Sequence, residues 1–428
     1  MKAFLTPVLF FAFVFGADLP VSAEPLTLQE AGATALRNHP QVAIAQLQEL
    51  VAQETVRQNR AAYFPTANGY FDGVEAGNRN TRILAGGLNN PVVYDRVADG
   101  LGVGELITDF GRTRNLLASA KLSARAQTAN TAATDQQILL NVDINYFNVL
   151  QTQAVFRVAQ ETVQARQLLV DQVMALEKNQ LRSELDVSFA EVGLEQSRLI
   201  LQKALGEAEG AQAGLSTALG YRELRHFELV DEPSVPGEIP DAETLIATAI
   251  NNRPDLQRLR YEQSAADRFA RARKDQNYPT VSAVGTIGNA MSHDYRLPDK
   301  YAAGGIAVDI PLFAGGEYLA KQHEAELKAR IAEQALRDKE DNVTRDVRVA
   351  WLNFNSAVQQ FRTTEQLLRH ANEAFSLAQA RYKIGSSSIV ELTDAQVNAT
   401  SAQIADANAL YDEFIQRAIL DYQTGLLR

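Results

Sequence analysis

Two carboxylates in the last part of the sequence, Glu391 and Asp394, have a spacing that could serve chemistry. They lie three positions apart, so on a helix they share one face. Carboxylates that converge favour cations, and their mutual repulsion raises some of their pKa values. The same spacing also occurs in ordinary pairs of solvated helix acids, and the spacing alone favours this second interpretation.

The remaining reactive side chains form no recognisable catalytic, metal-binding or phosphate-binding pattern. The histidines lack ligand spacing such as His-x-x-x-His; they occupy positions 39, 226, 293, 323 and 370. Gly86-Gly87 and Gly315-Gly316 are not followed by the Lys-Ser or Lys-Thr pair of a phosphate-binding loop. Cysteine is absent, which excludes disulfides, thiolate metal sites and cysteine nucleophiles. We therefore expect neither enzymatic activity nor a cofactor.

The charge balance argues against a nucleic-acid partner. The net charge is −11, the acids are spread along the chain, and no basic block occurs. Binding to a phosphate backbone needs clustered Lys and Arg side chains. We therefore expect no nucleic acid among the partners.

Residues 1–23 are predicted to be a signal peptide. Lys2 gives a short positive region, Phe4 to Gly16 is apolar, and Val21-Ser22-Ala23 ends in a small-x-small cleavage pattern. An N-terminal anchor is the alternative, but the apolar run is shorter than the roughly 20 residues of a transmembrane helix. The mature protein is therefore expected outside the cytoplasm.

The rest of the chain contains two copies of one unit. Asn38-His39-Pro40 recurs as Asn252-Arg253-Pro254. Further along, the copies correspond at Gly111 and Gly316, Tyr146 and Trp351, and Gly220 and Gly425. A unit of roughly 200 residues is too long for a solenoid repeat. We therefore expect a first structural repeat over residues 24–220, a proline-containing linker over 221–241, and a second repeat over 242–428.

Each copy predicts a very long helix. Neither proline nor glycine occurs from Arg112 to Val192, and glycine is absent from Glu317 to Ile384. Such runs are typical of helices, and a helix from Arg112 to about Gln180 would extend for roughly 100 Å at 1.5 Å per residue. Breaks at 181–183 and 385–388 lead into a returning helix of about 37 residues, as long as the helical segment that enters each strand pair. The two shorter helices could therefore stack end to end beside the long one.

Two strand pairs are expected between these helices. In the first copy, the glycine-rich residues 66–110 predict two strands around a loop at 77–91. In the second copy apolar residues alternate with small or polar ones; the apolar series are Val281, Ala283, Gly285 and Ile287, and Ile306, Val308, Ile310 and Leu312. Such strands suit a membrane barrel wall, and they equally suit a soluble hairpin. Four strands cannot close a barrel, so a membrane barrel would require several chains.

The order of these motifs resembles the TolC-type outer membrane factor family over essentially the whole mature chain. The resemblance rests on the two Asn-x-Pro units, on Tyr63-Phe64-Pro65, on Asp109-Phe110-Gly111-Arg112, and on Arg381-Tyr382-Lys383-Ile384-Gly385. It implies a fold that is mainly α with a small β part, in which each chain has duplicated long-helix coiled-coil hairpins plus four β-strands. It further implies a homotrimer, with a twelve-stranded β-barrel in outer membrane lipid and a twelve-helix α-barrel across the periplasm.

The same resemblance implies a passive exit duct of a tripartite efflux system, in which an inner-membrane pump and a periplasmic adaptor provide energy and substrate. The outer membrane component of a type I protein secretion system is the alternative within the channel class. A periplasmic coiled-coil scaffold without a pore is the alternative outside it, and heat-resistant trimers in detergent-extracted outer membranes would exclude that scaffold. The sequence leaves the substrate, the pump and the adaptor open, because such a duct is passive.

The resemblance also assigns roles to residues at the helix breaks. It places an entrance ring of carboxylates at Glu391 and Asp394, which a trimer would multiply to six acids. Links that close the entrance fall at Tyr382 and Asp186, while Ser387 occupies the position of the family's linking arginine and Arg182 is the candidate replacement. The adaptor-contact tip comprises Leu181, Ser183, Gly385 and Ser386. The first tip has Gln180 in place of the usual glycine.

Overall fold

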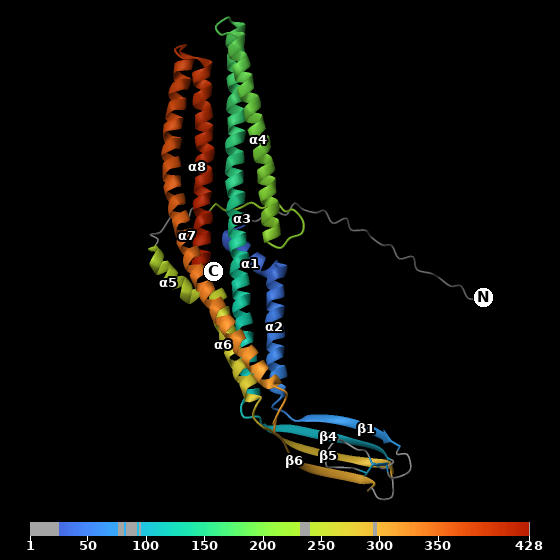
Figure 1. Ribbon diagram of the computed structural model, residues 1–428. Helices are drawn as coiled ribbons and strands as arrows, with labels where there is room; N and C mark the ends of the chain where they lie inside the picture. Colours follow the sequence, from blue (N-terminus) through green and yellow to red (C-terminus); the bar gives the residue numbers. More distant parts are fainter. Residues whose placement is uncertain are drawn as a thin grey trace, which may run out of the picture.

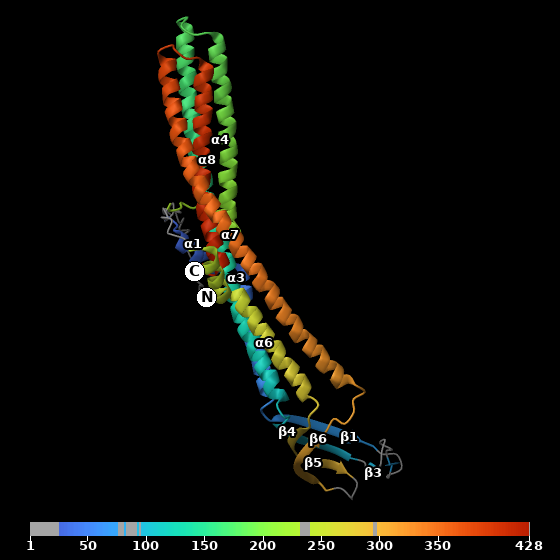
Figure 2. The same cartoon turned by 60° about the vertical axis from the view of Figure 1, so that its left-hand side comes forward.

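The computed structural model describes residues 25–75, 81–82, 92–93, 96–231, 240–293 and 298–427. The predicted signal peptide and most of the predicted loop at 77–91 lie outside these ranges. The body is elongated, with two helical hairpins at one end and a sheet at the other (Figures 1 and 2).

The helices follow the same order in both halves of the chain. The first half contains α1 (Leu28–Asn38), α2 (Pro40–Ala61), α3 (Arg112–Lys178) and α4 (Glu184–Ala218). The second half contains α5 (Ala242–Asn252), α6 (Pro254–Asp275), α7 (Glu317–Lys383) and α8 (Ile389–Thr424). The long helices α3 and α7 each have 67 residues, so the predicted helix lengths are confirmed to within a few residues. None of the helices in the described ranges combines the length and the apolar character that a transmembrane helix requires.

The short helices stack along the long ones as predicted. Both α2 and α4 pack on α3, at opposite halves of its length, and α6 and α8 pack on α7 in the same way (Figure 1). Because α3 also contacts α6 and α8, it joins the two halves of the chain. Apolar cores lie at the middle, where α1 and α5 cover the long helices, and again near the hairpin tips.

Left-handed backbone conformations mark the same places in both halves. Such residues, with φ between 56° and 116°, pair as Phe110 with Gly315, Gly111 with Gly316, Gln180 with Gly385, and Gly220 with Gly425. They lie at the entry and exit of the long helices and at the end of the returning ones. The chain therefore reverses direction by equivalent turns in each half, even where one half carries no glycine.

The helix break before each Asn-x-Pro proline uses different side chains in the two halves. His39 accepts a hydrogen bond from the main-chain N–H of Gln41 through Nδ1, at 3.2 Å. Arg253 instead donates to the Asp255 carboxylate at 2.7 and 3.0 Å and to the main-chain oxygen of Gln423 at 3.0 Å. Burial alone would raise the pKa of Asp255, but the hydrogen bonds and charges of Arg253 and Lys339 outweigh it and lower the pKa to about 2. The hydrogen bond from Arg253 to Gln423 fastens the break to the end of α8.

The strands form one antiparallel sheet in the order β1-β4-β5-β6. The bounds are β1 Thr66–Val74, β4 Arg96–Thr108, β5 Thr280–His293 and β6 Lys300–Asp309, and a separate short pair consists of β2 Thr81–Arg82 and β3 Val92–Val93. The return strand β6 ends at Asp309, so the prediction that Ile310 and Leu312 belong to it is wrong. Pro311 lacks the N–H group that a continuing ladder needs. Within the described residues, the outer edges of β1 and β6 have no strand partner.

The two faces of the sheet differ as the alternation predicted. Leu101 lies opposite Ile287 in the register, and these two are 53% and 59% exposed, while Ile306 on the next strand is 70% exposed. On the other face, the Tyr70 hydroxyl lies 2.5 Å from that of Thr286, and Tyr301 donates to Tyr70 at 2.9 Å. One face is therefore an exposed apolar surface, and the other carries a hydrogen-bonded polar cluster.

Candidate functional site

The predicted site residues lie at the far ends of the helical hairpins, opposite the sheet (Figure 1). At the end of α3 the N–H of Leu181 returns to the carbonyl of Leu176 at 2.9 Å, and at the end of α7 Ser386 returns to Arg381 at the same distance. This is the hydrogen-bond pattern that ends a helix around a left-handed residue. Gln180 provides that residue in the first hairpin, as Gly385 does in the second.

An apolar core holds the two hairpin ends together. Its buried members come from all four helices: Leu169, Val170, Val173, Ala190, Leu194, Ala378, Tyr382, Ile389 and Leu392. Because these side chains repeat at helical spacing, the core fixes the rotation of each helix about its axis. The polar residues at the turns are thereby presented on defined sides of the tip.

Arg182 and Tyr382, two of the predicted link residues, are in contact within the chain. The Arg182 guanidinium donates to the main-chain oxygen of Tyr382 at 3.0 Å and lies over its ring, 4.2 Å from the centroid. Tyr382 is 5% exposed, and its hydroxyl has no hydrogen-bond partner among the described residues. Burial raises the pKa of Tyr382, with the Arg182 charge acting in the opposite direction. A cation over an aromatic face is a favourable contact, so Arg182 joins the first hairpin to the second.

The other two predicted link residues bond to their own turns. The Asp186 carboxylate accepts from the N–H and the hydroxyl of Ser183 at 3.1 and 3.0 Å, which is a capping box at the start of α4. The Ser387 hydroxyl donates to the main-chain oxygen of Ser388 at 3.3 Å. A role for either residue in a link to a neighbouring chain stays a prediction.

The two predicted entrance carboxylates differ in their surroundings. Glu391 pairs with Arg381 at 2.9 Å, and both side chains are partly exposed. Asp394 is exposed, and no described residue forms a hydrogen bond or ion pair with its carboxylate. Sequence spacing did not indicate the arginine, because it comes from the preceding helix across the turn. Asp394 therefore carries the uncompensated charge of the pair.

The predicted adaptor-contact residues are accessible at the tip. Leu181 is 69% exposed, and Ser183, Gly385 and Ser386 are also exposed. Ile384 beside them is 80% exposed. The ends of the hairpins thus expose apolar side chains, of the kind that mark an interaction site when they form a patch.

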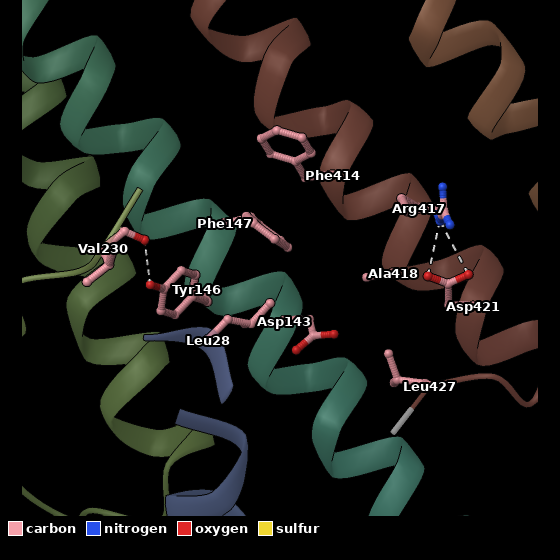
Figure 3. Close-up of a pocket in the computed structure, with 10 residues that line it drawn as sticks. All are labelled: Leu28, Asp143, Tyr146, Phe147, Val230, Phe414, Arg417, Ala418, Asp421 and Leu427. Carbon is pink, nitrogen blue, oxygen red and sulfur yellow. Dashed lines mark hydrogen bonds and ion pairs between the residues drawn. The ribbon is translucent and has the colours of Figure 1, made fainter. Parts of the chain in front are cut away.

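Sequence reasoning missed a buried carboxylate, Asp143, in the middle of α3. It lines a pocket with a cavity volume of about 370 Å³ between α3 and α8 (Figure 3). Burial, together with the Asp421 charge, raises the pKa of Asp143 to about 7. The available signal was an acid within the apolar run Leu139-Leu140-Asn141-Val142-Asp143-Ile144.

Comparison with known proteins identifies the family. The sequence profile of the outer membrane efflux protein family matches residues 32–221 and 245–425. Outer membrane protein TolC of Vibrio cholerae is 24% identical over 414 residues, covering 92% of this chain and 89% of that protein. The solvent efflux pump outer membrane protein SrpC of Pseudomonas putida is 25% identical over 395 residues, covering 86% of this chain and 78% of that protein.

Solved structures show the same fold. The crystal structure of CusC superposes with a TM-score of 0.79 at 22% identity, covering 93% of this chain and 92% of that chain. The outer membrane channel CmeC of Campylobacter jejuni gives 0.78 at 17% identity, covering 99% and 94%. With the profile match over most of both halves, the chain belongs to the outer membrane efflux protein family.

Proposed function

We propose that this outer membrane protein assembles as a homotrimer that forms the passive exit duct of a tripartite efflux system. The observation that carries the proposal is the four-stranded sheet, which has one exposed apolar face and, within the described residues, two edges without a strand partner. In lipid, every unpaired backbone group at such an edge would cost several kcal/mol. Three chains that pair β6 of one with β1 of the next would close a barrel of twelve strands and leave no edge.

The helical part supports a duct that reaches through the periplasm. Each long helix of 67 residues would extend for roughly 100 Å at 1.5 Å per residue. Each chain contributes two long helices and two stacks of shorter helices beside them, so three chains would place twelve helices side by side around such a tube. An inner-membrane pump and a periplasmic adaptor would deliver the substrate. The names of relatives, a solvent efflux and a toluene efflux outer membrane protein, favour small molecules as that substrate.

The assembly is tested by mass measurement in detergent. We expect the mature chain to migrate as a species of three chains, because one chain cannot close its sheet. We also expect this species, and no smaller one, to conduct ions in a planar bilayer. A monomer that conducts would contradict the proposal.

The tip is tested by crosslinking to the adaptor in cells. Photo-reactive groups at Ser183 and Ser387 are expected to capture the adaptor, because both residues lie at the turns of the hairpins and are partly or fully exposed. Matched probes in the predicted loop at 77–91, between the strands β1 and β4 in the sequence, are expected to capture none. If only the loop probes captured it, the orientation of the chain would be reversed.

A further inference from the structure

The pocket between α3 and α8 has features of a binding site that the proposed duct does not use. It lies midway along the long helices, where α1 and the segment around Val230 cover them, and its cavity volume is about 370 Å³ (Figure 3). This size is at the lower end of the range for small-molecule sites. Most of its wall is apolar, with Phe147 and Phe414 on one side and Leu28 and Leu427 on the other.

Asp143 is a polar group in the pocket that none of the described residues satisfies. Its side chain points into the pocket in Figure 3 and is 9% exposed. None of the described residues donates a hydrogen bond to it or forms an ion pair with it. A buried carboxylate without a partner costs considerable free energy, so a cationic hydrogen-bond donor in the pocket would relieve that cost.

The charges around Asp143 define the charge of the ligand. Arg417 and Asp421, on successive turns of α8, are the other charged residues that line the pocket. Arg417 Nε donates to the Asp421 carboxylate at 3.1 and 3.4 Å, so these two charges compensate each other. With Asp143 ionised, the pocket holds one net negative charge. One monovalent cation neutralises it.

We propose that this pocket binds a small organic cation with one ammonium group on a compact apolar body. The ammonium group donates to Asp143, and the apolar body packs against the wall formed by Phe147 and Phe414, whose ring centroids lie 5.3 Å apart. Calcium or magnesium suits the pocket poorly, because such ions take six or more oxygen ligands. The described residues contain no group of three or more acids or histidines that could hold a metal.

Competition between a proton and the cation for Asp143 makes binding depend on pH. The pKa of Asp143 is about 7 because of its burial and the nearby Asp421 charge. A bound cation favours the ionised form and lowers that pKa. Near neutral pH, binding therefore releases a proton from the fraction of Asp143 that is protonated, and the affinity falls as the pH falls below 7.

The experiment is a ligand-observed fluorine NMR titration of the detergent-solubilised full assembly with 2-(4-fluorophenyl)ethylammonium. The neutral analogue 2-(4-fluorophenyl)ethanol has nearly the same shape. The wild type is expected to bind the ammonium at least about tenfold more tightly than the alcohol, as for hydrogen bonds to charged groups. Calorimetry in two buffers of different ionisation enthalpy is expected to show proton release at pH 7.

Matched variants locate the site. Asp143→Asn is expected to reduce ammonium binding to the level of the alcohol and to remove the proton release. Asp171→Asn, an exposed acid on the same helix, is expected to change neither. Ala418→Leu keeps the carboxylate but fills the pocket, and it is expected to abolish binding. Equal binding of ammonium and alcohol, or unchanged binding in Asp143→Asn or in Ala418→Leu, would overturn the proposal, whether or not the protein conducts as a duct.

Discussion

Replacing Asp394 by Asn is expected to remove most of the block that a trivalent cation imposes from the periplasmic side of the channel. In a trimer this carboxylate occurs three times around the proposed entrance, and no described residue of its own chain compensates it. Carboxylates gathered around one entrance attract a multivalent cation more strongly than a monovalent one, because the Coulomb energy between each carboxylate and the cation is proportional to the charge of the cation. We expect the blocking concentration to rise by about tenfold or more in low salt, and less in high salt.

Glu391 and Arg381 provide the internal comparison. Glu391→Gln alone leaves the Arg381 charge without its partner, so this variant makes the mouth less negative. The double variant Glu391→Gln with Asp394→Asn is expected to lose the block and the cation preference most completely. Arg381→Gln frees Glu391 and is expected to strengthen the block. Single-channel recordings of the wild type and these four variants in one salt decide this. If Asp394→Asn and Arg381→Gln both behave like the wild type, the constriction lies elsewhere and these residues are surface acids and bases.

Replacing Gly220 by Ala is expected to cause a large loss of stability for the addition of a single methyl group. Its φ is +84°, and an added Cβ would lie 2.9 Å from the main-chain carbon and oxygen of Asn38. Left-handed backbone costs a non-glycine residue about 1–2 kcal/mol, and the clash falls on backbone that cannot swing aside. We therefore expect a total loss of about 2–4 kcal/mol, in the range of severe point substitutions.

Two other glycines calibrate this expectation. Gly425, the counterpart of Gly220 in the second half, has a φ of +72°. A Cβ added there would lie no closer than 3.2 Å to its nearest neighbour, the main-chain nitrogen of Arg253, so Gly425→Ala should cost less stability than Gly220→Ala. Gly206, inside α4, has open space around an added Cβ, and Gly206→Ala should stabilise the helix by about 0.5–1 kcal/mol. Thermal unfolding of the purified assembly gives the order. A Gly220→Ala protein as stable as the wild type would show that the turn can rearrange.

The helices and the helix breaks could be predicted because their signals are local. Proline and glycine are absent from the runs that became α3 and α7, and the Asn-x-Pro units stand where α1 and α5 end. The sequence predicted that β6 continues to Leu312, because the apolar alternation does so. The strand ends at Asp309, because Pro311 interrupts the hydrogen-bond ladder. Apolar periodicity reports which face a residue occupies, but not whether its backbone is paired.

The contacts at the tip could not be predicted because they depend on the relative rotation and translation of two hairpins. Arg182 meets Tyr382 although 200 positions separate them. The Arg381–Glu391 pair depends on how tightly the turn at Gly385 closes. The role of Asp143 in a pocket could not be predicted for a different reason. Its helix is apolar around it, but nothing local indicates that α8 and the segment near Val230 close over it.

The sheet order has a consequence for how a closed ring of several chains would be built. The β4–β5 pairing joins the last strand of the first repeat to the first strand of the second, and a β6–β1 pairing between chains would repeat the same relation. A closed ring of three chains would therefore have pseudo-sixfold symmetry, in which covalent and non-covalent junctions alternate. Covalent duplication halves the number of subunits that must find one another. It also frees the two members of each pair to diverge, as Arg182 and Ser387 have done at equivalent turns.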